Sequence, residues 1–149
     1  MRADEPANRP PRESSAGEGA ERVTGIRVLV ANEPRSYRES FVEALRMLRP
    51  EAEISEVQPD DLDQRIEDLK PDLIICSRLT LAVERTPAWL LVYPEGRPVT
   101  MVYTAGKLSS FIDLDLDKIL SVVDRTAELV NSERRLARGR TTGLRDPEA

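Results

Sequence analysis

Three short segments of the chain have the hydrophobic pattern of β-strands. Residues 26–30 and 72–76 are nearly continuous apolar runs, which is typical of strands buried on both faces of a parallel sheet. Residues 53–57 alternate polar and apolar side chains, as a half-exposed edge strand does. We therefore expect 72–76 at the centre of a sheet and 53–57 at its edge.

Helical spacing of apolar residues predicts three helices. The first covers residues 34–49 and is preceded by Asn32 as an expected N-cap. A short second helix is expected over residues 62–69, and a last one over 116–130, with a continuation toward Leu136. The apolar stripe of the first helix consists of Tyr37, Phe41, Leu45 and Leu48.

Two further strands are expected at residues 89–93 and 99–104, with a Pro- and Gly-containing turn between them. A parallel crossover needs about a dozen residues or more, so this short connection predicts an antiparallel hairpin. Residues 77–87 leave room for one or two helical turns at most.

The order of these elements is strand, helix, strand, helix, strand, strand, strand, helix. Alternating strands and helices predict right-handed crossovers and a sheet covered on both faces. We expect an α/β fold: a three-layer, doubly wound, mostly parallel five-stranded sheet, whose fourth helix is missing and replaced by a β-hairpin, so that the edge is antiparallel. This domain is expected over residues 25–138, between polar segments 1–24 and 139–149 that are predicted to be disordered.

Charge argues against a nucleic-acid-binding surface on the domain. Residues 25–131 hold 13 basic and 19 acidic side chains, whereas a surface that binds nucleic acid is basic. The stretch from Arg134 to Arg145 is richer in arginine, but acids dilute it, and we interpret it as a solvated helix end and linker.

A single cysteine, Cys76, excludes an intrachain disulfide and fits a reducing compartment. No run approaches the ~20 apolar residues of a membrane span, and the first residues lack the apolar core of a secretory signal. We therefore expect a cytoplasmic protein without membrane contact. The common signatures of enzymes, cofactor sites and zinc sites are absent from the sequence, so neither catalysis nor a cofactor or metal is expected.

Three stretches resemble the receiver domain of bacterial two-component response regulators, which has a CheY-like, flavodoxin-like fold. They are VLVANEPRSYRESFVEALR at residues 28–46, PDLIICSR at 71–78 and DLDKIL at 115–120. In receivers these positions hold a buried strand followed by two acids and a helix, then the strand that ends at the phosphoacceptor aspartate, then the start of the last helix. The resemblance covers residues 26 to about 130, and it implies a receiver-like scaffold.

The departures from the family imply a degenerate phosphorylation pocket. The acid pair that holds Mg²⁺ in receivers falls at Ala31 and Asn32, where a methyl group and a neutral amide replace carboxylates. The phosphoacceptor position falls at Ser77, which cannot form an acyl phosphate, and no histidine is present to activate it. Thr104 and Lys107 are the nearest counterparts of the family's phosphoryl-contacting Thr and Lys. The expected degenerate pocket is Ala31, Asn32, Glu33, Ser77, Thr104 and Lys107.

Other candidate sites have plain structural interpretations beside the functional ones. Asn32 and Glu33 could hold a cation or small ligand at the carboxyl ends of the strands, but a helix cap with a favourable charge explains them better. Asp113, Asp115 and Asp117 are interpreted as helix-start charges, and Cys76 as a buried apolar residue. The aromatic residues of the hairpin fit an interaction surface and core packing equally well; they are Trp89, Tyr93 and Tyr103.

The first functional hypothesis is a non-catalytic pseudo-receiver that acts in signalling or regulation by protein–protein interaction, with an unidentified protein partner or as a homodimer. The alternative is a small-ligand sensor or weak enzyme that uses the crevice around Asn32, Glu33, Ser77 and Arg78. A third hypothesis is a nucleic-acid accessory protein that uses the Arg-rich tail, which the acidic domain makes the least favoured.

Overall fold

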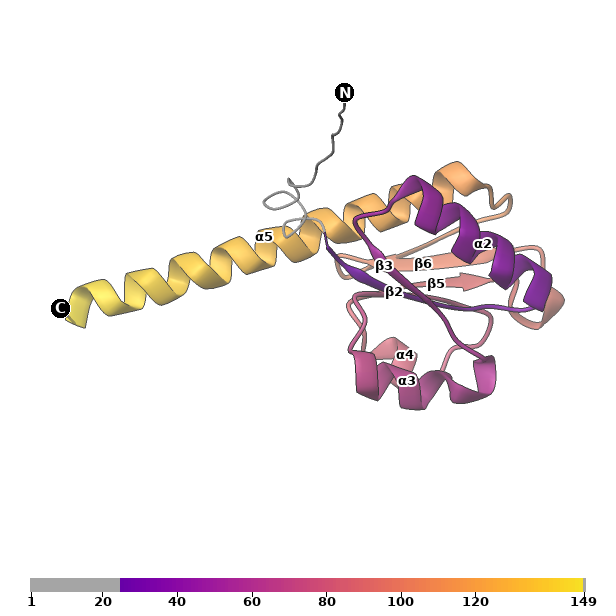
Figure 1. The fold of residues 1–149 in the computed structure, drawn as a ribbon, viewed down its shortest axis with the longest axis horizontal. Coiled ribbons are helices and arrows are strands. Elements are labelled where there is room, and N and C mark those ends of the chain that lie inside the picture. The colour runs from indigo at the N-terminus through magenta and orange to yellow at the C-terminus, as the bar shows by residue number, and fades with distance from the viewer. Residues whose placement is uncertain (1–24, 149) are drawn as a thin grey trace, which may run out of the picture.

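A computed structural model describes residues 25–148, with side chains described as far as residue 137. Within this part of the chain, the core of the structure is one six-stranded sheet with strand order β3-β2-β4-β5-β6-β7 and helices on both faces (Figure 1). The strands are β2 (Arg27–Ala31), β3 (Glu53–Glu56), β4 (Leu73–Cys76), β5 (Ala88–Val92), β6 (Thr100–Thr104) and β7 (Lys107–Phe111).

Four α-helices lie in the described residues. They are α2 (Arg35–Leu48), α3 (Leu62–Leu69), α4 (Leu81–Glu84) and α5 (Leu116–Glu148), with short 3-10 turns at η1 (Pro59–Asp61) and η2 (Pro94–Gly96). Helices α2 and α5 lie over one face of the sheet, and α3 and α4 lie over the other (Figure 1). Helix α5 continues past the sheet and projects away from the rest of the domain (Figure 1).

The sheet is mixed. Strand β2 pairs in parallel with β3 and β4, and β4 pairs in parallel with β5. The pairs β5–β6 and β6–β7 are antiparallel, so the predicted antiparallel hairpin is confirmed. The predicted fold class is nevertheless wrong: the sheet has six strands, its last two pairings are antiparallel, and a receiver-like fold is not shown.

The missed strand explains this error. Strand β7 follows a two-residue turn formed by Ala105 and Gly106, with φ of 56° and 73°. Two-residue turns with two positive φ values match the twist of an antiparallel hairpin. Because the side chains of β7 are largely exposed, its sequence lacks the buried apolar pattern that identified the inner strands.

Two apolar clusters hold the helices on the sheet. On the α2 and α5 side, the cluster is built from residues such as Val28, Val30 and Leu45, together with Ile119 and Val123 of α5. On the α3 and α4 side, it is built around Leu29, Ala31, Leu62, Val83 and Trp89. As expected of a central strand, β4 is buried along its whole length and contributes alternate residues to both clusters.

Helix α2 is rotated relative to the predicted apolar stripe. Tyr37 and Leu48 are exposed, whereas Arg38 and Val42 are buried beside the correctly predicted Leu45. The expected capping by Asn32 is also wrong, because Pro34 occupies the N-cap position and no side chain caps the helix. The main-chain oxygen of Pro34 accepts hydrogen bonds from the amides of Tyr37 and Arg38.

Helix α5 begins as predicted. Asp115 Oδ1 accepts a hydrogen bond from the Lys118 amide at 2.9 Å, which supports the interpretation of this acidic stretch as a helix start. Arg49, at the end of α2, forms a bidentate ion pair with Asp124 of α5 at 2.7 and 2.8 Å. The predicted disorder of residues 1–24 concerns residues outside the described part, and of residues 139–149 only the α5 backbone to Glu148 is described.

Candidate functional site

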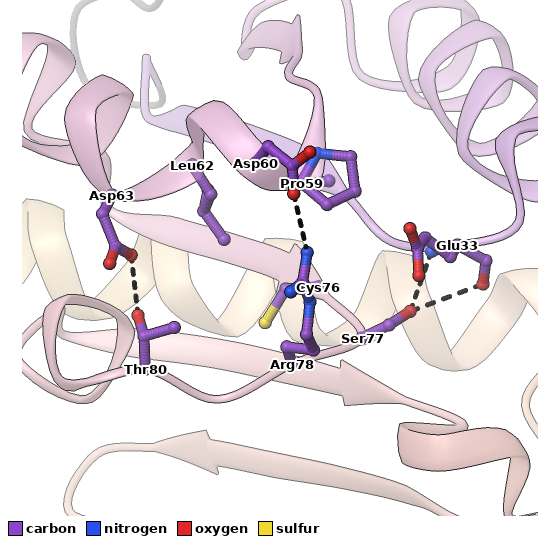
Figure 2. Close-up of a pocket in the computed structure, with 10 residues that line it drawn as sticks. Glu33, Pro59, Asp60, Leu62, Asp63, Cys76, Ser77, Arg78 and Thr80 are labelled. Carbon is purple, nitrogen blue, oxygen red and sulfur yellow. Dashed lines mark hydrogen bonds and ion pairs between the residues drawn. The ribbon is translucent and has the colours of Figure 1, made fainter.

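A crevice lies where parallel strands β2 and β4 end, facing η1 and the first turn of α3. Ligands of open α/β sheets usually bind at the carboxyl ends of the strands. The crevice has a volume of about 180 Å³. Its lining residues are Ala31, Glu33, Pro59, Asp60, Leu62, Asp63, Cys76, Ser77, Arg78 and Thr80 (Figure 2).

Ser77 joins the two loops that follow β2 and β4. Its Oγ accepts a hydrogen bond from the amide of Glu33 at 2.8 Å and lies 3.4 Å from the main-chain oxygen of Glu33, to which it donates (Figure 2). Both the donor and one acceptor position of the hydroxyl are therefore used within the chain. The contact fixes the start of α2 against the end of β4.

Two further contacts cross the crevice. Arg78 Nη2 lies 3.4 Å from Asp60 Oδ1, and Thr80 Oγ1 donates to Asp63 Oδ1 at 2.8 Å (Figure 2). Thr80 Oγ1 also accepts from the amide of Val83 at 3.3 Å, so it caps α4. The Arg78–Asp60 pair is highly exposed and contributes little to stability. Together these contacts attach η1 and α3 to the β4–β5 connection.

The chemistry open to this crevice is limited. Its charged groups are three carboxylates, on Glu33, Asp60 and Asp63, and the guanidinium of Arg78. The chain has no histidine to act as a base near neutral pH. Ligand sites usually measure about 300–1,000 Å³, so this crevice is small for a metabolite. No group of three or more potential metal-ligating side chains is found among the described residues.

Of the predicted pocket residues, Ala31, Glu33 and Ser77 meet in this crevice. The Ala31 side chain is buried in the cluster beneath α3 and α4. Asn32 is fully buried but does not line the crevice, because side chains alternate along a strand and Asn32 follows Val30 on the opposite face. Neither polar atom of its side chain has a hydrogen-bond partner within the described structure.

Thr104 and Lys107 lie far from the other predicted pocket residues. Strand β6 runs antiparallel to β5, so Thr100 is level with the end of β5 while Thr104 lies toward its beginning. Lys107 is opposite Thr104 on β7. Both residues therefore lie toward the ends of the strands opposite to those that carry Ser77, and the structure does not bring them into the crevice.

The three hairpin aromatics do not form one surface. Trp89 and Tyr103 are cross-strand neighbours whose rings stack at a centroid distance of 5.6 Å. Trp89 is buried, and Tyr103 is half-buried against the same cluster. Tyr93 packs against the other cluster, on the α2 and α5 side. Core packing therefore accounts for Trp89, while Tyr103 retains an exposed part.

Cys76 is buried at the end of β4. Burial raises the pKa of its thiol to about 12, although a backbone hydrogen bond with Arg78 acts in the opposite direction.

The reactive thiolate of Cys76 is therefore scarce at pH 8, and we expect native protein to resist iodoacetamide while unfolded protein reacts fully. Stability should fall as pH rises above about 8.5, where the unfolded thiol ionises and the buried one does not. Alkylation followed by mass spectrometry, with and without denaturant, checks the first point. Rapid native labelling would contradict this burial.

Comparison of the chain with protein-family models, with curated proteins and with solved structures finds no match. The receiver resemblance therefore rests on the three sequence stretches alone. No helix in the described part of the chain combines the length and apolar character needed to cross a membrane.

The sequence did not identify every residue that shapes this site. Asp60 follows Pro59 at a position typical of a helix-start charge, and no sequence motif marks Asp63 or Thr80. Their contacts depend on how α3 approaches the β4–β5 connection, which no local pattern encodes. Thr80 had one available signal, since a threonine before a short helical stretch is a standard N-cap.

Proposed function

We propose that this chain is a non-catalytic regulatory module that acts by binding protein and does not respond to phosphorylation. The observation that carries the proposal is the engagement of Ser77 by the backbone of Glu33. A serine hydroxyl at the position of the receiver phosphoacceptor cannot form an acyl phosphate. In this crevice it also donates its proton to a carbonyl oxygen, which is not a base that could activate it.

The lack of a carboxylate pair supports the same proposal. Mg²⁺ prefers carboxylate oxygens, and the two positions that resemble the receiver acid pair carry a buried methyl group at Ala31 and a buried amide at Asn32. Of the three carboxylates that line the crevice, Glu33 is the one that follows β2, beside the loop that Ser77 contacts. The separation of Thr104 and Lys107 from Ser77 removes the remaining groups that would contact a phosphoryl group.

Binding of protein is favoured by the outer half of the sheet on the α3 and α4 side. A row of cross-strand neighbours on this face runs from Ile74 through Trp89 and Tyr103 to Leu108. Ile74 and Trp89 are buried, Tyr103 is half-buried, and Leu108 is 58% exposed. Apolar and aromatic side chains that are only partly covered are common anchors of protein interfaces. We further propose a cytoplasmic location, in keeping with the single buried thiol.

The proposal is tested by amide chemical shifts of the full chain during titration with Mg²⁺ and then beryllofluoride, a mimic of a phosphoryl group. We expect no saturable shifts at Glu33, Ser77 and Arg78 beyond those produced by a monovalent salt of equal ionic strength. Saturable shifts that vanish in Glu33→Gln would show that the crevice binds these ions. That outcome would overturn the phosphorylation-independent function.

A further inference from the structure

The two outer strands of the sheet differ in how their free edges are protected. In β3, the amides of Glu53 and Val57 bond to β2, so the main-chain groups of Ile54 face outward. Arg46 of α2 donates to the Ile54 oxygen from Nε at 3.3 Å and from Nη2 at 2.9 Å. This strand also begins and ends with glutamate, and charged side chains discourage strand addition.

Strand β7 lacks these protections. In a hairpin with a two-residue turn, the residues next to the turn form a hydrogen-bonded pair, here Thr104 and Lys107. By alternation, the main-chain groups of Leu108 and Ser110 point away from β6. No hydrogen bond from these groups to any other element is found in the described part of the chain. Residues 108–111 contain no charge and no proline, so β7 is open to strand addition.

The side chains around this open edge are also unpartnered. Leu108 is 58% exposed, and Ile112, directly after β7, is 69% exposed. Among the described residues, neither Lys107 nor Asp113 has an ion-pair partner for its side chain. The edge therefore presents apolar and oppositely charged groups: Lys107 begins β7, and Ile112 and Asp113 directly follow its last residue.

We propose that β7 pairs antiparallel with β7 of a second copy of this chain across a two-fold axis, so that one sheet runs through both copies. Ser110 lies opposite Ser110 on the axis, Leu108 lies opposite Ile112, and Lys107 lies opposite Asp113. This pairing covers two exposed apolar side chains of each copy and joins opposite charges at both ends. The inference rests on the proposed protein-binding function and names a second copy as the partner.

The outward-facing residues restrict the register. Because Leu108 and Ser110 carry the free main-chain groups, only registers that place even-numbered residues opposite one another form hydrogen bonds. The allowed register centred on Phe111 places Ile112 opposite Ser110, so that Leu108 and Ile112 no longer meet. The other neighbouring register centres on Ser109 and places Leu108 opposite Ser110 and Lys107 opposite Phe111. That register would leave Ile112 without an apolar neighbour and Asp113 without a cation, so the Ser110-centred register is favoured.

Sedimentation velocity of the full chain over a range of concentrations is the first test. We expect the mass to rise from 16.7 kDa toward twice that value. Ser110→Lys places two like charges opposite each other and should weaken association about fivefold or more. Ser109→Lys is the matched control, since Ser109 faces Phe111 of the other copy, and should change association little. A wild-type chain that remains at 16.7 kDa at about 1 mM overturns the proposal, since even millimolar affinity would then be absent.

Oxidative cross-linking tests the register independently of association strength. Cα atoms of directly opposite residues lie about 5.5 Å apart, within disulfide range, whereas diagonal neighbours lie about 7–8 Å apart. Ser110→Cys should therefore cross-link, and Ser109→Cys should not, with wild type as the control for buried Cys76. Cross-linking of Ser109→Cys in preference to Ser110→Cys overturns the stated register.

Charge reversal separates this inference from a general loss of folding. Lys107→Asp and Asp113→Lys should each weaken association, and the double variant should restore it, because the opposite charges still meet. Failure of the double variant to recover would contradict the Lys107–Asp113 pairing. These outcomes leave the proposed function untouched, because that function is judged by ion binding at Glu33 and Ser77, which is remote from β7.

Discussion

Replacement of Trp89 by alanine is expected to lower the free energy of unfolding by about 3–5 kcal/mol, the usual cost of truncating a large buried aromatic side chain. Trp89 is only 5% exposed, and its ring stacks on Tyr103. The expected loss is a large part of the about 5–15 kcal/mol that stabilises a typical domain. Because the variant lacks the only tryptophan, urea unfolding must be followed by circular dichroism.

Leu108→Ala is the matched control for this prediction. Leu108 belongs to the same cross-strand row but is mostly exposed, so its truncation should change stability by no more than about 0.5 kcal/mol in dilute monomer. Comparable losses in the two variants would contradict the gradient of burial along the row. A loss below about 1 kcal/mol for Trp89→Ala would mean that this ring is not part of the core.

The second large effect is expected at the ion pair between Arg38 and Glu56. Arg38 is 4% exposed, and its Nε lies 3.0 Å from Glu56 Oε2, while its Nη1 donates to the main-chain oxygen of Asn32 at 3.2 Å. Glu56→Ala leaves a buried guanidinium without a counter-ion. Breaking a fully buried pair costs about 3–5 kcal/mol, and we expect about 2–3 kcal/mol here because Glu56 is 36% exposed.

A double-mutant cycle makes this prediction specific. Arg38→Met keeps much of the side-chain volume, so the Arg38→Met/Glu56→Ala double variant should be more stable than Glu56→Ala alone. Glu39→Ala is the control on the same helix, because the Arg35–Glu39 pair is exposed and its loss should be undetectable by urea unfolding. If the two single losses simply add, the buried pair is not coupled as its geometry indicates.

The inner elements were predictable because burial leaves a strong pattern. Strands β2 and β4 lie within a residue of their predicted positions, since a strand covered on both faces must be apolar throughout. Strand β7 was missed because its side chains face solvent and because Ala105, rather than the usual asparagine or aspartate, occupies a turn position with positive φ. The rotation of α2 was missed because Arg38 is stabilised inside by partners that are distant in sequence.

The candidate site was predictable only in part. Glu33 and Ser77 follow adjacent parallel strands, so their proximity follows from the strand order. Thr104 and Lys107 were grouped with them on the resemblance alone, and the direction of β6 separates them. The contacts of Asp60 and Asp63 depend on helix packing, which the sequence pattern does not determine.

The contact of Arg46 with the outward oxygen of Ile54 has a consequence for protein at high concentration. Fibrous aggregates grow when each added molecule brings a new free edge on which the next can assemble. Here the outward oxygen of Ile54 on the β3 edge is bonded to Arg46 of the same molecule, which leaves the β7 edge of each copy for strand addition. A dimer that pairs the β7 edges of its two copies has no open sheet edge left, so it cannot add a third copy. In the proposed dimer the sheet therefore ends at the two β3 strands, where Arg46 covers the outward oxygen of Ile54.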